Sequence, residues 1–180
     1  DEEVLVVTSE RPVIQTAFNV KWEKVNELKP GHALIVKKDF DVKEVEINSP
    51  SNLQKCSFER IYFSRGTDKD IYKERLILGS LVTPQVLEAV NFDLKRTVFS
   101  FIPNTAEMSY YGMIKATEDY LSGVKKKKIQ ELDQNDHKYQ EKLDDILSIR
   151  TRGEKIMGKD AKLRTFITQD DFRDEMVAHV

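Results

Sequence analysis

The first fifty residues carry short apolar blocks separated by polar ones. The β-branched run Val4–Val7 predicts a strand, which polar residues and Pro12 then end. His32–Lys37 and the alternating stretch Val42–Ile47 predict two further strands, and the turn at Pro30–Gly31 leads into the first of them. The pattern therefore indicates a β-hairpin near the N-terminus, whereas residues 13–18 fit more than one state.

A linker and a change of period follow the hairpin. Asn48–Gln54 is rich in Asn, Ser and Pro, and we expect a boundary there. Cys56–Phe63 is mainly apolar and predicts a strand. Apolar residues then recur at helical spacing over 70–90, with an interruption near Thr83–Pro84 that predicts two helices or a break.

The stretch Thr97–Ile102 predicts a short buried strand, and helical spacing resumes over Ala106–Leu121, with Ser122–Gly123 as the expected C-cap. The polar loop between them contains Asn104 and Thr105. Ligands of open α/β sheets collect beyond the carboxyl ends of strands, where a helix N-terminus attracts anions. Asn104 and Thr105 are therefore candidate ligand-binding residues, and the alternative is that one of them only caps the helix.

The C-terminal third begins with a heptad-like stripe, which predicts one long helix with a thin apolar face. Its members are Ile129, Leu132, Tyr139, Leu143 and Ile146. Leu163–Thr168 predicts a strand or extended segment, and Gln169–Val180 predicts a final helix. The alternation of strands and helices places the chain in the α/β class, α+β overall.

Composition narrows the function classes. The 180 residues are 39% apolar and 33% charged, with a net charge of −2, which provides no field for nucleic acid or an acidic membrane. Nearby acidic residues compensate the charge of the lysine run Lys125–Lys128.

A single cysteine excludes an intramolecular disulfide framework, and neither a signal peptide nor a membrane-spanning run is apparent, so we expect a cytoplasmic location. We also expect the chain to be a piece of a longer protein, because it starts without Met and stops within an apolar pattern.

Few residue patterns in the chain indicate a catalytic, metal-binding or anion-binding site. The three histidines are far apart and no glycine-rich phosphate loop is present. Cys56 lies in an apolar stretch, which favours a buried structural thiol. Arg65 could hold an anion, but an ion pair with Asp68 or Asp70 is the simpler expectation. Arg164 stands next to Thr165, and an arginine beside a hydroxyl is a combination that binds phosphate. The alternative is a surface arginine beside a strand threonine.

An ordered series of short motifs resembles the glutamine amidophosphoribosyltransferases, which begin purine synthesis. Cys56–Arg65 is similar to the family's Cys-x-Phe-Glu-x-x-Tyr-Phe-Ala-Arg segment, and Arg164–Ile167 is identical to its Arg-Thr-Phe-Ile loop. The further matching positions are Ser9–Glu10, Lys29–Ala33, Tyr72, Arg75, Gly79, Ile102–Thr105, Gly112, Gln169 and Arg173. The resemblance covers nearly the whole chain except an insertion at about 124–153.

The resemblance implies a fold and a division into domains. Residues 1–48 would be the closing strands of an N-terminal-nucleophile glutaminase domain, and residues 49–55 a linker. Residues 56–180 would be the first half of a Rossmann-like phosphoribosyltransferase domain. The catalytic cysteine and the acidic substrate motif of the family would lie outside this chain, so the piece alone is expected to be inactive.

The implied activity of the parent is synthesis of 5-phosphoribosylamine from phosphoribosyl pyrophosphate and glutamine. Arg164, Thr165, Asn104, Thr105 and Arg65 would contribute to substrate binding, with Arg65 structural or at a domain interface. Magnesium would accompany the pyrophosphate. The expected associations are inhibitory purine nucleotides and a homo-oligomer, without nucleic acid or membrane.

Two features leave alternatives open. Cys56 matches a position that supplies an iron–sulfur ligand in some members of the family, although others keep the cysteine without a cluster. The loop Arg65–Asp68 departs from the family's usual Arg-Pro-Asp-Ser. This departure and the inserted helix fit a second hypothesis, a catalytically degenerate homologue that acts as a regulatory or interaction module. A glutamine-dependent enzyme with another synthase domain is a third hypothesis, against which the Arg-Thr-Phe-Ile loop argues.

Overall fold

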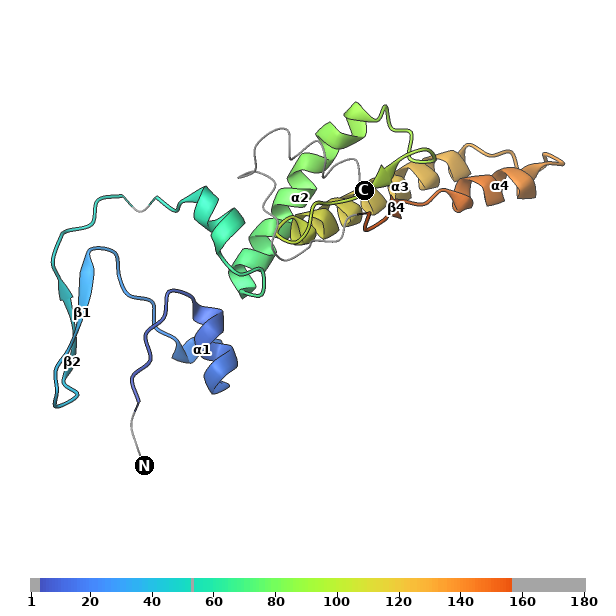
Figure 1. The fold of residues 1–180 in the computed structure, drawn as a ribbon. Coiled ribbons are helices and arrows are strands. Elements are labelled where there is room, and N and C mark those ends of the chain that lie inside the picture. The colour runs from blue at the N-terminus through green and yellow to red at the C-terminus, as the bar shows by residue number, and fades with distance from the viewer. Residues whose placement is uncertain (1–3, 53, 157–180) are drawn as a thin grey trace, which may run out of the picture. The chain divides into compact units, whose positions relative to one another are not determined.

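The computed structural model describes residues 4–52 and 54–156, and it combines helices with small β-sheets (Figure 1). The chain divides into two compact units, the first ending at Ile71 and the second beginning at Tyr72. The division falls later in the chain than the linker expected at 49–55, and the assignment of 1–48 and 56–180 to two enzyme domains stays a prediction.

The first unit begins with a segment in no regular structure and then forms α1 (Arg11–Phe18) and the short 3-10 helix η1 (Trp22–Lys24). The strand expected at Val4–Val7 is wrong. A strand is stabilised by hydrogen bonds to a neighbouring strand, and in the described part of this unit β1 and β2 pair only with each other. The open stretch 13–18 is helical, and proline near the start of α1 suits a first helical turn.

The predicted hairpin is confirmed. Strands β1 (His32–Val36) and β2 (Val42–Glu46) pair antiparallel, with His32 opposite Glu46 and Val36 opposite Val42. Gly31 adopts a φ of +73° before β1, and a Cβ there would collide with the carbonyl oxygen of Asn48. Glycine is therefore required where the chain enters the hairpin.

The strand predicted at Cys56–Phe63 is wrong, because this stretch coils into a helical turn that ends in the π-helix η2 (Glu59–Phe63). The rings of Phe58 and Tyr62 stack with centroids 5.2 Å apart, and Phe63 lies 5.3 Å from Phe58 and 5.1 Å from Tyr62. Residues four and five apart meet on a helix but not along a strand. Ring clustering thus stabilises the helical state, although Phe58 and Phe63 stay mostly exposed.

The second unit is organised around two long helices, α2 (Lys69–Ala89, which begins at the end of the first unit) and α3 (Glu107–Gln130). They cross where Gly79 faces Gly112. A Cβ on Gly79 would collide with the carbonyl oxygen of Ser109, and one on Gly112 with that of Leu76. The Ser80 hydroxyl also lies 3.3 Å from the Gly112 carbonyl oxygen, to which it donates. The two backbones therefore touch directly.

The break predicted near Thr83–Pro84 is wrong, since α2 continues through Pro84. Thr83 and Leu87 are each 3% exposed, and the Thr83 hydroxyl donates to the Gly79 carbonyl oxygen at 2.9 Å. Buried contacts on both sides of the proline hold the helix together where one backbone hydrogen bond is missing.

A pair of parallel strands and a small core complete the second unit. Strand β3 (Val98–Phe99) lies beside β4 (Arg152–Gly153), with α3 and α4 (Tyr139–Ser148) between them in the chain. The predicted strand at Thr97–Ile102 is thus confirmed in shortened form, and β4 was not predicted. The core cluster consists of Leu87, Leu94, Phe99 and Leu121.

The expected C-cap at Gly123 is wrong, because α3 runs on to Gln130. Lysines in its last turn suit the negative end of the helix dipole. The single helix expected over 129–146 is also wrong. Asp133 and Asp136 accept hydrogen bonds, each of 2.9 Å, from the amides of Asn135 and Lys138, and these turns separate α3 from α4.

No helix among the described residues has the length and apolar character needed to cross a membrane. The strand expected at Leu163–Thr168 and the helix expected at Gln169–Val180 lie outside the described residues.

Candidate functional site

The strongest candidate site is the edge at which β3 and β4 both end. The Glu154 amide donates to the Phe99 carbonyl oxygen at 2.9 Å, and the Ile156 amide lies 3.4 Å from the hydroxyl oxygen of Ser100. These contacts continue the parallel pairing beyond the two-residue strands. Parallel strands end at a common edge, so the loop after β3 and the segment after β4 leave the sheet side by side.

Asn104 and Thr105 lie in the turn that links this edge to α3. The turn spans 103–106, and the Glu107 amide donates to the Asn104 carbonyl oxygen at 3.2 Å. Ala106 is the N-cap, and no side chain caps the helix, so the expectation that Asn104 or Thr105 would do so is wrong. The turn presents the backbone carbonyl of Asn104 to the helix and leaves the Asn104 side chain exposed. Uncapped amides at a helix start can donate to an anion.

Two tyrosines lie near the start of α3. The ring of Tyr110 packs 4.8 Å from that of Phe101, and a Cβ on Gly153 would collide with the Tyr110 hydroxyl. Burial raises the pKa of Tyr110, and the neighbouring Tyr111 and Glu154 add to the effect. Gly153 therefore gives Tyr110 the room to lie against β4.

Tyr111 stands beside an acidic group. Its hydroxyl donates to Glu107 Oε1 at 3.3 Å, and the charge of Glu107 followed by this hydrogen bond raises the pKa of Tyr111. Both tyrosines thus keep their phenolic protons at neutral pH and act as hydrogen-bond donors or acceptors. The edge offers amide, hydroxyl and carboxylate groups, which suits binding of a polar ligand.

Arg65 lies in the first unit, and its predicted ion pair with Asp68 or Asp70 is wrong. Its Nε atom lies 3.1 Å from a carboxylate oxygen of Glu10, and its side chain is 62% exposed. Asp68 and Asp70 are instead bound by Arg11. An exposed arginine with a carboxylate partner carries no evidence of an anion site.

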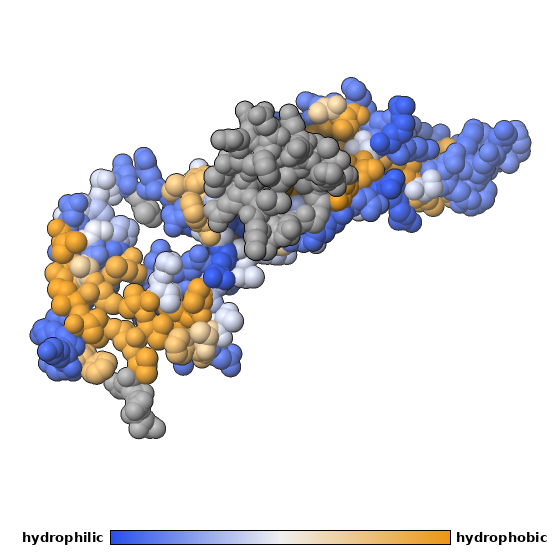
Figure 2. Space-filling model, viewed as in Figure 1, coloured by the Kyte–Doolittle hydropathy of each residue, from blue (hydrophilic) through white to orange (hydrophobic). Residues whose placement is uncertain are grey.

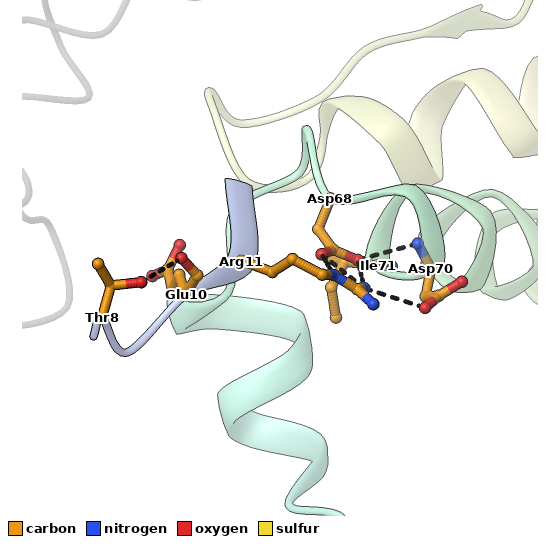
Figure 3. A network of polar contacts seen from close by, with 6 residues as sticks. All are labelled: Thr8, Glu10, Arg11, Asp68, Asp70 and Ile71. Atoms are coloured by element: carbon orange, nitrogen blue, oxygen red, sulfur yellow. Dashed lines mark hydrogen bonds and ion pairs between the residues drawn. The ribbon is translucent and has the colours of Figure 1, made fainter. Parts of the chain in front are cut away.

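Arg11 is the centre of a polar network that sequence reasoning missed (Figure 3). Its Nε and Nη2 atoms donate to both carboxylate oxygens of Asp68 at 2.8–3.0 Å, and Nη2 also donates to Asp70 at 3.0 Å. The guanidinium lies 5.0 Å from the centre of the Trp22 ring. The stacking on Trp22 and the hydrogen bonds to the two aspartates hold the arginine side chain in one position.

Asp68 also caps the start of α2. Its Oδ1 atom accepts hydrogen bonds from the amides of Asp70, at 2.9 Å, and Ile71, at 3.3 Å. Burial acts to raise the pKa of Asp68, but the hydrogen bonds from Arg11 and these amides outweigh it, so the pKa lies below its usual value. An aspartate just before an apolar helical run is a recognisable N-cap, whereas nothing near Arg11 in the sequence indicates its partner. The network ties α1 to the start of α2 and is structural.

Cys56 is exposed, so the expectation of a buried thiol is wrong. It precedes the helical turn at 57–63 instead of lying inside a strand. Iron–sulfur clusters take four cysteine ligands as a rule, and this chain has one, so its residues do not fit a cluster by themselves. Within residues 4–52 and 54–156 no group of three His, Cys, Asp or Glu side chains could hold a metal ion, and the expected magnesium and iron–sulfur cofactors stay predictions.

Arg164 and Thr165 lie outside the described residues, so the structure brings together only Asn104 and Thr105 of the predicted site. Comparisons with protein-family models, curated proteins and solved structures found no match to this chain.

Proposed function

We propose that this chain is part of an amidophosphoribosyltransferase-like enzyme of the cytoplasm, which makes 5-phosphoribosylamine from phosphoribosyl pyrophosphate and glutamine. The proposal rests on the ordered motifs that resemble this family. In this interpretation the β1–β2 hairpin belongs to a glutaminase domain. The β3–α3–α4–β4 segment would then begin a Rossmann-like sheet.

The structural observation that supports the proposal is the position of Asn104 and Thr105 at the carboxyl edge of the parallel pair β3–β4. Anionic ligands of open α/β sheets bind at this edge, next to a helix N-terminus. No side chain caps the start of α3, and beyond the Glu107 amide, which donates to the Asn104 carbonyl oxygen, the positive end of the helix could serve a phosphate or ribose oxygen. This geometry supports binding of a phosphorylated substrate.

The proposed roles follow from chemistry and chain order. Asn104 and Thr105 would hydrogen-bond the substrate, and Arg164 would neutralise phosphate charge as its loop closes. Ammonia released from glutamine would attack C1 of the ribose as the bond from C1 to the pyrophosphate oxygen breaks. Magnesium would travel with the pyrophosphate, and we assign no ligand to it among the described residues. Arg65 would remain structural through Glu10.

The test uses the full-length gene product, purified and supplied with phosphoribosyl pyrophosphate. Pyrophosphate release is measured with glutamine and then with ammonia as the nitrogen source. A hydrogen bond to a charged group contributes about 1.5–3 kcal/mol, so Asn104→Ala should lower kcat/KM about 10-fold to 100-fold with either nitrogen source. Arg164→Ala should lower it at least as much.

Asn135→Ala is the matched control, because Asn135 is an exposed asparagine in the turn between α3 and α4. Its kcat/KM should equal that of the wild type. Absence of turnover with both nitrogen sources, in a protein with native circular dichroism, would reject the enzymatic proposal.

The second candidate is a catalytically degenerate homologue that acts as an interaction module. The observation that favours it is the α3–α4 helical hairpin, which carries Lys125–Lys128 on one helix and acidic residues of α4 on the other. A folded protein that neither turns over nor binds phosphoribosyl pyrophosphate would favour this candidate.

A further inference from the structure

The outward side of α2 is unusually apolar for a surface helix. Ile77 is 57% exposed and Leu81 is 70% exposed, and Leu78 and Val82 beside them are each about 40% exposed. The inward side of the same helix is also packed, through Gly79 and Leu87. A helix that is apolar on all sides is ordinarily buried on all sides. The outward side of α2 therefore lacks a covering element in the described structure.

One row on this side has the spacing of a helix–helix seam. Lys73, Ile77, Leu81, Pro84 and Glu88 follow one another at intervals of four, four, three and four residues. Such intervals keep side chains on one face of a helix, as at the a and d positions of a coiled coil. The two ends of the row carry opposite charges, and both end residues are exposed.

A hollow opens beside this row, between α2 and α3. Its volume is about 260 Å³, and its walls include Ser80, Pro84, Leu87, Phe92 and Tyr120. Pockets that enclose small molecules usually measure about 300–1,000 Å³ and bury most of the ligand, so this shallow apolar hollow is better suited to a protruding side chain. Leu81 is more exposed than Ile77, the other large apolar side chain of the row, and it follows Ser80, a residue of the wall, directly along α2.

We propose that α2 is the contact surface between two copies of this chain, which pack antiparallel about a two-fold axis near Ser80 and Leu81. In a two-fold contact the same patch serves both partners, so a protrusion and a hollow on one patch fill each other. Leu81 of each copy enters the hollow of the other. Antiparallel packing sets Lys73 of each copy against Glu88 of the other.

The charges select a second copy over an unrelated partner. Lys73 and Glu88 lie at equal distances from the centre of the row, so reversal of the helix brings opposite charges together at both ends. A parallel arrangement would instead oppose like charges at both ends. The proposal does not depend on the enzymatic function proposed above.

The test measures the dissociation constant of the 180-residue chain by sedimentation equilibrium. Leu81→Glu should raise it at least about 30-fold, because it places a charge in the centre of the contact. Leu147→Glu is the matched control, since Leu147 is an exposed leucine on α4, and it should leave the constant unchanged.

Charge reversal tests the antiparallel arrangement itself. Lys73→Glu and Glu88→Lys should each weaken self-association, since each opposes like charges at both ends. The double variant should recover the wild-type constant, and so should an equimolar mixture of the two single variants. Lys126→Glu, an exposed reversal on α3, should have no effect.

Three results would overturn the proposal. One is a chain that stays monomeric at all concentrations, and another is a dimer that Leu81→Glu leaves intact. The third is a Lys73→Glu, Glu88→Lys double variant that associates no better than either single variant. Circular dichroism of every variant separates loss of contact from loss of folding.

Discussion

The two units of the chain are stabilised in different ways. Among the described residues of the first unit, Pro12, Asp68 and Ile71 are buried, and the network of Arg11 and Asp68 links its helical parts. In the second unit the core cluster is buried and α2 meets α3 backbone to backbone at Gly112. Apolar burial and close packing therefore dominate the second unit, whereas a polar contact carries much of the first.

The surface of the first unit shows the same contrast. Figure 2 shows apolar residues gathered over its β1–β2 end, where Ile35, Val36, Phe40 and Ile47 are 46–71% exposed. A two-stranded hairpin without a packed face is only marginally stable in water. The contrast teaches that secondary structure can form in a segment that has little core of its own, and that substitutions should act differently in the two units.

Removal of a core side chain should have the largest effect. Phe99 is 4% exposed, and Phe99→Ala should lower the free energy of unfolding by about 3–5 kcal/mol through lost burial and a cavity. Phe63→Ala in the first unit removes a ring that is 62% exposed and should cost less than about 1 kcal/mol. Urea denaturation followed by circular dichroism measures both, and equal losses would contradict the contrast between the units.

The crossing of α2 and α3 gives a second test with two glycines of one helix. Gly112→Ala should destabilise by about 1–3 kcal/mol, because its methyl group would collide with the backbone of α2. Gly123→Ala should stabilise by about 0.5–1 kcal/mol, since nothing lies within 4 Å of its added Cβ and alanine favours a helix. Urea denaturation should give opposite signs, and destabilisation by both would show that the crossing is not the cause.

The polar network of the first unit should respond to pH. Asp68→Asn should destabilise this unit by about 1–2 kcal/mol at pH 7, because Arg11 loses its charged partner. The pKa of Asp68 is lower in the folded than in the unfolded chain, so this stabilisation is present above about pH 4 and is lost as the pH falls through the folded value. Backbone hydrogen exchange at the start of α2 should therefore distinguish the variant from the wild type more strongly at pH 7 than at pH 3.

Asp119→Asn is the control for this pH dependence, because Asp119 is exposed on α3. It should leave hydrogen exchange unchanged at both pH values. A difference between Asp68→Asn and the wild type that persists undiminished at pH 3 would mean that the lost hydrogen-bond geometry, and not the charge, stabilises the network.

The ion pair between the exposed Arg65 and the partly buried Glu10 should contribute least. Arg65→Ala should change the free energy of unfolding by no more than about 0.5 kcal/mol, because water screens the charge of the exposed arginine. A thermal melt in low salt would detect a larger effect. A loss as large as that of Asp68→Asn would show that exposure does not separate this ion pair from the one between Arg11 and Asp68.

Local patterns allowed part of the fold to be predicted from the sequence. The alternation at Val42–Ile47 and the glycine before β1 fixed the hairpin, and the apolar run before Pro103 located β3. The pattern failed at Cys56–Phe63, because a short apolar run fits a strand or a helix equally well. It also failed at Gly123, where glycine lies inside a helix with helix-forming lysines beyond it.

The candidate site was predictable in part. Asn104 and Thr105 follow a strand and precede a helix, so their place at a sheet edge follows from chain order. The partner of Arg65 was not predictable. The nearby Asp68 is bound by Arg11, which lies 57 residues away in the chain, and no local pattern indicates a contact over that separation. Strand β4 has two residues, too few to show any period.

The separation of β3 from β4 in the chain has a consequence for the order of folding. The β1–β2 hairpin closes a short loop, which takes microseconds, and α3 and α4 each form from neighbouring residues. The pairing of Val98 with Arg152 must bring together two segments that are separated in the chain by both helices. Such non-local contacts form late, because closing the long loop costs entropy before the stabilising contacts are made. We therefore expect substitutions in β3 and β4 to shorten the lifetime of the native state while leaving the rate of folding nearly unchanged.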